Sequence, residues 1–244
     1  MTGFIIADPA DPTDPAGQET FRDIFNGTDI RAQWVRSPAE LAGVECDFVL
    51  DLSGGAGIAG GVAARIGGGP AGTPGTDGAT PIAAALAQCN APLILTDAVT
   101  PTLADLGADP RLVRINGWNT FLQRPLAEVV APEVCLPLLD EFFKAWKKSF
   151  VLLPDVPGMP SARIVSMIVN EAYFALGEGV STIESIDTAM KLGTNYPFGP
   201  FEWCDLIGPG RILRLLERLA EDNPRYAIAP LLRDEAKTAL CPYY

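Results

Sequence analysis

Carboxylates are the first candidates for chemistry in this sequence. Asp47 and Asp51 lie in the segment CDFVLDL, which has the continuous apolar character of a buried strand. Side chains alternate between the two faces of a strand, so residues four apart share a face. Such a pair could serve in hydrolysis, although aspartates are also common at the strand ends of α/β sheets. The sequence alone leaves both interpretations open.

Histidine is absent from the chain, and this excludes several kinds of site. A histidine-dependent catalytic triad is ruled out, and no GxSxG motif is present. A zinc site would need clustered thiolates or carboxylates, and the sequence shows no such cluster. The cysteines are widely spaced and form no CxxC pair, so we expect reduced, buried thiols in a cytoplasmic protein and no metal site. They are Cys46, Cys89, Cys135, Cys204 and Cys241.

Glycines in a GxGxxG pattern, Gly55, Gly57 and Gly60, follow the strand CDFVLDL. They fall in the glycine-dense segment 53–79, which is either a phosphate-binding loop or an irregular loop. A dinucleotide site needs the pattern directly after the first strand, where backbone N–H groups can approach a phosphate. That position is occupied by DPADPTDPAG, whose aspartates would repel pyrophosphate.

The net charge of −12 argues against binding to nucleic acids or to anionic membrane surfaces. The sequence contains no uninterrupted apolar run of about 18 residues, so we expect no transmembrane helix. The N-terminal residues carry acids where a secretory signal would carry basic residues.

Short strands alternate with helices in the first part of the chain, a pattern that predicts a parallel α/β sheet. Expected strands are Phe4–Ala7, Ile30–Val35, Cys46–Leu52, Pro92–Thr96 and Leu112–Ile115. Expected helices cover Gln18–Phe25, begin at Ser37 and Thr80, and run from Thr100 to Gly107.

Helical spacing dominates from Pro132 onward. Ser181 and Glu184 suggest a capping box, and Pro200 and Gly208 suggest the two ends of a short helix. We therefore expect two domains, residues 1–155 and residues 156–244.

The segment NEAYFALGEGVSTIESIDTAMKLGTNYPFGPFEWCDLIG, Asn170–Gly208, resembles the C-terminal domain of 3-hydroxyacyl-CoA dehydrogenases. Upstream, VPGMPSAR is similar to the family's VPGFIVNR. The resemblance implies a Rossmann-like parallel-sheet domain followed by an all-α, 6-phosphogluconate-dehydrogenase-like domain. It also implies NAD as cofactor, an acyl-CoA-like ligand, a place in fatty-acid metabolism and a homodimer formed through the helical domain.

The segment RLVRINGWNTFLQRPLAEVV resembles the part of the family that carries the catalytic histidine. By this resemblance, Asn116 occupies the histidine position and Glu128 matches the glutamate that orients it. Asn119 matches a residue expected on the substrate side. Ala162 replaces an asparagine of the family. An amide has no useful basicity at neutral pH, so the match predicts a protein that lacks the usual proton acceptor.

Three hypotheses follow. The first is an impaired or inactive dehydrogenase homologue that still binds an acyl-CoA-like ligand. The second is an active NAD-dependent oxidoreductase in which water, Glu128 or a tyrosine transfers the proton. The third is a non-enzymatic dimeric binding or scaffold module.

Overall fold

The computed structural model describes the chain except residues 7–23, 36–40, 42, 53–89 and 241–244. Two compact units account for it, Met1–Val156 and Pro157–Tyr244. The predicted helices at Gln18–Phe25, Ser37 and Thr80 fall wholly or mainly outside the described residues. The glycine pattern at Gly55, Gly57 and Gly60 does so too.

The first unit is built on a seven-stranded sheet with the order β2-β1-β3-β4-β5-β6-β7. All neighbouring strands are parallel except β5 and β6, which are antiparallel. The predicted α/β fold class is therefore confirmed. The strands are β1 (Thr2–Ile6), β2 (Arg31–Val35), β3 (Phe48–Asp51), β4 (Ile94–Thr96), β5 (Leu112–Ile115), β6 (Leu126–Val130) and β7 (Ser149–Leu152).

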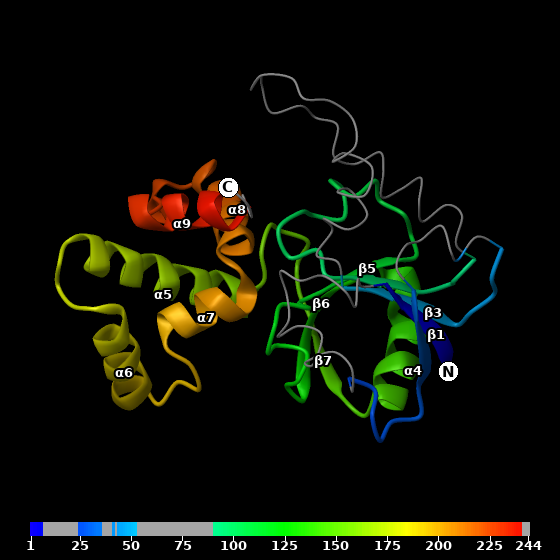
Figure 1. Cartoon of the computed structure of the whole chain (residues 1–244). Coiled ribbons are helices and arrows are strands. Elements are labelled where there is room, and N and C mark those ends of the chain that lie inside the picture. The colour runs from blue at the N-terminus through cyan, green and yellow to red at the C-terminus, as the bar shows by residue number, and fades with distance from the viewer. Residues whose placement is uncertain (7–23, 36–40, 42, 53–89, 241–244) are drawn as a thin grey trace. The chain divides into compact units, whose positions relative to one another are not determined.

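Apolar side chains cover both faces of this sheet, as expected where parallel strands are buried on both sides. One face packs against the helix α4 (Leu136–Trp146), which runs beside the strands in Figure 1. Four of its side chains are almost fully buried there: Leu139, Phe142, Phe143 and Trp146. On the other face Val49, Ile94 and Leu112 form a separate cluster.

The segment from Thr100 to Gly107 forms turns, so the predicted helix there is wrong. Its polar side chains bind backbone groups that a helix would use. The Asp105 carboxylate accepts a hydrogen bond from the Thr102 amide at 2.8 Å, and the Asp105 amide donates to the Thr102 hydroxyl at 3.1 Å. Gly107 and Ala108 then take positive φ angles of 92° and 53°, which end the segment.

The second unit is helical, as predicted from the spacing of its apolar residues. The helix α5 packs against α7, α8 and α9, and α6 packs against α7. The predicted short helix between Pro200 and Gly208 is confirmed as α7. The elements are α5 (Pro160–Gly177), α6 (Ile183–Thr194), α7 (Pro200–Ile207), α8 (Pro209–Ala220), the 3₁₀ helix η3 (Pro224–Tyr226) and α9 (Pro230–Leu240).

The cap of α6 differs from the predicted one by a single residue. Thr182, not Ser181, is the N-cap, and its hydroxyl accepts a hydrogen bond from the Ser185 amide at 3.3 Å. Both hydroxyl side chains precede the same apolar stripe, so the sequence pattern could not separate them.

A carboxylate from α6 caps the N-terminus of α7. The N-cap of α7 is Gly199, which has no side chain that could accept a hydrogen bond. Asp187 supplies the acceptor instead. Its carboxylate accepts hydrogen bonds from the Phe201 amide at 2.9 Å and from the Glu202 amide at 3.2 Å. A Cβ at Gly199 would overlap the Asp187 side chain, so the cap requires glycine at this position.

Gly199→Ala should destabilise the helical unit by about 1–3 kcal/mol, because the added methyl group displaces the capping carboxylate. Urea unfolding followed by far-UV circular dichroism measures this change. Gly193→Ala is the matched control, because nothing lies within 4 Å of its added Cβ. It lies in the last turn of α6 and should be neutral or stabilise by up to about 1 kcal/mol. Equal effects of the two substitutions would contradict the proposed role of Asp187.

Candidate active site

The candidate site lies where β3, β4 and β5 end, at the carboxyl edge of the parallel part of the sheet. Ligands of α/β proteins bind at this edge. Polar residues that end or follow these strands are almost fully buried, although side chains of these types usually face solvent. They are Asp51, Thr96, Asp97, Asn116 and Asn119.

Asn116 and Glu128, paired by the sequence resemblance, are in direct contact. The Asn116 side chain donates a hydrogen bond from Nδ2 to Glu128 Oε2 at 2.8 Å. Asn116 Oδ1 accepts the Trp118 amide at 3.3 Å. The antiparallel pairing of β5 and β6 brings the two residues together, because the Asn116 backbone amide also donates to the Glu128 carbonyl at 3.1 Å.

This pair can bind and orient a ligand, but its amide cannot accept a proton at neutral pH. The two bonds fix the amide with Oδ1 toward the backbone and Nδ2 toward the carboxylate. One N–H of Nδ2 remains for a ligand oxygen. The Glu128 carboxylate is half-buried and is the group of this pair that could take up a proton.

A buried carboxylate also ties the loops after β4 and β5 together. Asp97 Oδ1 accepts the Gly117 amide at 2.9 Å, and a Cβ added at Gly117 would lie 2.8 Å from Asp97 Cβ and Cγ. The Asp97 amide donates to the Asp51 carbonyl at 2.8 Å. These contacts leave little room for either loop to shift without moving the other.

Of the two interpretations of Asp47 and Asp51, the structure does not support a hydrolytic pair. Asp51 is buried and accepts a hydrogen bond from the Thr96 hydroxyl at 3.1 Å. Asp47 is exposed and accepts the Thr2 amide at 2.7 Å. The two residues lie at opposite ends of β3, and four residues of strand separate them by about 13 Å.

Asn119 has the least satisfied side chain in the described part of the site. It is 4% exposed, and neither its Oδ1 nor its Nδ2 has a hydrogen-bond partner. The next residue, Thr120, has a buried unpartnered hydroxyl and a φ of 76°, which is unusual for a β-branched residue. Buried polar groups are normally paired, so the Asn119 amide has hydrogen-bonding capacity that the described residues do not use.

Two further residues, one in each unit, bear on the sequence resemblance. Ala162 lies on α5 and is fully buried, so the family's asparagine is replaced here by a methyl group that cannot form a hydrogen bond. Arg124 was not predicted as part of the site. Burial lowers the pKa of its guanidinium, while the charge of Glu128 raises it. Its sequence context gave no signal, because an arginine in a polar loop is usually solvated.

The described residues do not fit the pyrophosphate of a dinucleotide. The carboxyl ends of β3 and β4 present Asp51 and Asp97, which are acids, and the sequence after β1 also contains aspartates and lacks a glycine triad. An anion site would instead offer backbone N–H groups at a glycine-rich turn. We therefore derive no chemical step through NAD.

Other classes of site receive no support from the described part of the chain. It contains no group of three or more potential metal-ligating side chains. None of its helices has the length and apolar character needed to cross a membrane. Cys135 and Cys204 are buried thiols, and burial raises the pKa of Cys204 to about 12, so this thiol is not a nucleophile at neutral pH.

Residues 158–239 match the family model described as the C-terminal domain of 3-hydroxyacyl-CoA dehydrogenase. The predicted resemblance is thereby confirmed for the helical unit. The chain is 48% identical over 112 residues to 3-hydroxyadipyl-CoA dehydrogenase of Escherichia coli, covering 45% of this chain and 24% of that protein. It is 38% identical over 140 residues to 3-hydroxybutyryl-CoA dehydrogenase of Bradyrhizobium diazoefficiens, covering 55% and 48%.

Solved structures align with most of the chain. FadB2 of M. tuberculosis aligns with a TM-score of 0.63 and 17% identity, covering 85% of this chain and 70% of that one. The (S)-3-hydroxybutyryl-CoA dehydrogenase PaaH1 of Ralstonia eutropha aligns with a TM-score of 0.59 and 22% identity over the same shares. These structures support the predicted order of a Rossmann-like sheet followed by helices. The chain spans less than half of the length of the two relatives compared by sequence.

Two asparagine substitutions should have different effects on stability. Asn116→Ala removes the amide that binds Glu128 and Trp118, and should cost about 1–3 kcal/mol. Asn119→Ala breaks no hydrogen bond and removes an unpaired polar group, so the loss should stay below about 1 kcal/mol. Urea unfolding of the two variants measures both changes. A loss for Asn119→Ala as large as that for Asn116→Ala would mean that Asn119 has a structural role.

Proposed function

We propose that this chain, whose helical unit is a C-terminal domain of the 3-hydroxyacyl-CoA dehydrogenase family, binds an acyl-CoA-like ligand and is impaired in the dehydrogenase reaction. The observation that carries the proposal is the state of the loop after β5. It holds a buried amide without partners, Asn119, beside an Asn116–Glu128 pair whose Asn116 amide cannot act as a general base.

The chemistry of Asn119 suits a 3-oxoacyl or 3-hydroxyacyl group. Its Nδ2 can donate to a carbonyl oxygen, and its Oδ1 can accept from a hydroxyl group. Both atoms are buried, so a ligand that pairs with them removes an existing energetic penalty. The remaining N–H of Asn116 offers a second donor on the same loop.

The same geometry explains the impairment. Oxidation of a 3-hydroxy group requires removal of the hydroxyl proton as the hydride leaves. Asn116 cannot accept this proton, and the absence of a general base typically slows such a step by about 10²–10⁴-fold. Glu128 is bonded to the amide instead of to an imidazole.

The relatives and the fold imply NAD, which would supply the hydride acceptor when bound. The acidic carboxyl edge of the sheet argues against tight binding of its pyrophosphate. Loss of cofactor affinity is therefore a second, independent part of the proposed impairment.

Two alternatives predict different binding. In an active oxidoreductase, Glu128, water or a tyrosine would take the proton, and NADH would bind saturably. In a dimeric module without enzymatic activity, neither ligand would bind. A groove along α5 favours this second alternative, because Ile164 is 59% exposed there beside Met167 and Ile168. We also propose that the chain forms a homodimer through the helical unit.

Calorimetric titration distinguishes these alternatives. The native chain should bind acetoacetyl-CoA, and Asn119→Ala should weaken binding by about tenfold or more, because two hydrogen bonds to the ligand are lost. NADH should show no saturable binding. Gln123→Ala is the matched control, because it removes an exposed amide from the same loop and should leave affinity unchanged.

Saturable NADH binding would support the active oxidoreductase instead. A stable dimer that binds neither compound would support the scaffold module.

A further inference from the structure

We propose that Arg114 is a positioning residue that holds the loops of the candidate site in place from within the sheet. The proposal rests on the proposed function in one respect: the loop after β5 is taken as the ligand site. Arg114 lies on β5, two residues before Asn116, and is fully buried. Residues two apart on a strand share a face, so both side chains lie on the same side of the sheet.

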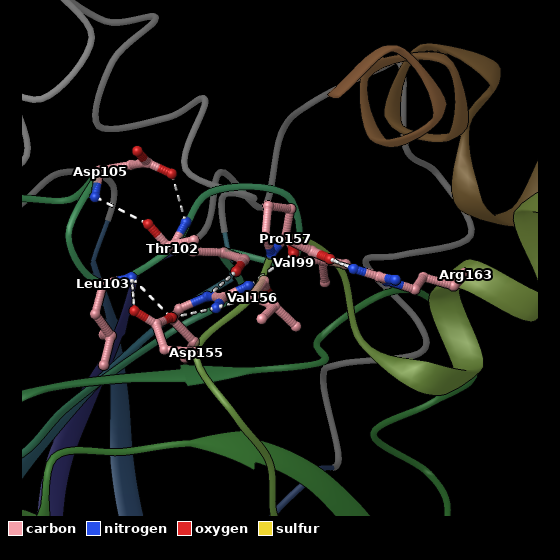
Figure 2. Close-up of polar contacts among 10 residues, drawn as sticks. Val99, Thr102, Leu103, Asp105, Asp155, Val156, Pro157 and Arg163 are labelled. Carbon is pink, nitrogen blue, oxygen red and sulfur yellow. Dashed lines mark hydrogen bonds and ion pairs between the residues drawn. The ribbon is translucent and has the colours of Figure 1, made fainter. Parts of the chain in front are cut away.

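The Arg114 guanidinium binds two segments of the chain besides its own strand. Its Nε donates to the Ala98 carbonyl at 2.8 Å, and its Nη2 donates to the Val99 carbonyl at 2.9 Å. Its Nη1 donates to Asp155 Oδ1 at 2.6 Å and to the Val156 carbonyl at 3.2 Å. Figure 2 shows Val99, Asp155 and Val156 gathered in this cluster.

The first of these segments carries part of the site. Ala98 and Val99 directly follow Asp97, whose carboxylate accepts the Gly117 amide. The Asp97 side chain already fills the space beside Gly117. A shift of residues 97–99 would therefore displace Gly117 and change the orientation of its neighbour Asn116. By fixing two carbonyl groups of this segment, Arg114 prevents that shift.

The second segment, Asp155–Val156, supplies the opposite charge. Both Asp155 oxygens accept the Leu103 amide at 3.0 Å, so this carboxylate also holds the turn that follows Val99 (Figure 2). Together, the hydrogen bonds of Arg114 and Asp155 hold both ends of the segment 98–103. Each donor of the guanidinium lies in a fixed direction, which a lysine ammonium cannot reproduce.

A buried ion pair could instead contribute only to overall stability. That role would affect all slowly exchanging amides of the sheet alike, whereas a positioning role acts locally. The Gly117 amide reports on the site, because it donates to Asp97. The Val49 amide reports on the sheet, because it donates to the Leu93 carbonyl at 2.9 Å.

Hydrogen exchange measured by NMR on the full chain without ligand separates the two roles. In Arg114→Lys, protection of the Gly117 amide should fall about tenfold or more, while protection of Val49 should change by less than about threefold. Asp155→Asn keeps an acceptor for Leu103 and should produce the same selective pattern more weakly. Arg111→Lys is the matched control, because Arg111 pairs with Asp109 just before β5 and should leave Gly117 unchanged.

Equal loss of protection at Gly117 and Val49, or an unchanged Gly117, would overturn the positioning role. Because no ligand is added, this result does not depend on whether acetoacetyl-CoA binds. If the native chain binds it, Arg114→Lys should also raise the Kd by about tenfold or more. Unchanged affinity of Arg114→Lys would overturn the positioning role even where Gly117 protection falls.

Discussion

The antiparallel pairing of β5 and β6 is the constraint on which the candidate site depends. In an otherwise parallel neighbourhood, this reversal places Glu128 opposite Asn116, where backbone and side-chain hydrogen bonds join the two residues. The loop between the strands, residues 116–125, must then reverse the direction of the chain. It carries the buried amide of Asn119 and the strained backbone of Thr120. A local strand pairing thus determines which polar groups remain available to a ligand.

The chemistry at this position follows from residue type. An imidazole between a carboxylate and a substrate hydroxyl can accept and return a proton, whereas an amide can only donate and accept hydrogen bonds. In this chain the pair of Asn116 and Glu128 is joined by a hydrogen bond, but the Asn116 amide lacks basicity. Under the proposed function, recognition and turnover are separable, and the packing around Asp97 and Arg114 would support the first without supplying the second.

The sequence predicted those features that depend on local pattern. The buried strands and the apolar stripes of α5 and α8 have clear periodicities, and the Asn116–Glu128 pair followed from a resemblance over a continuous segment. Features that depend on long-range contacts were missed. The strands β6 and β7 carry weak patterns beside prolines and lysines. The Thr100–Gly107 segment has helix-like ends, but its side chains bind the backbone of a turn. Nor could the sequence reveal that Arg114 is buried or that Asn119 lacks partners.

The most direct test of the account is NADH oxidation by the native chain with saturating acetoacetyl-CoA at neutral pH. The account predicts a rate below about 0.01 s⁻¹, roughly 10²-fold under the lower end of the 1–10³ s⁻¹ range typical of enzymes, because no group at position 116 can supply the proton. Turnover within that typical range would contradict the central claim. It would show that another group transfers the proton and that the acidic edge of the sheet accommodates the cofactor.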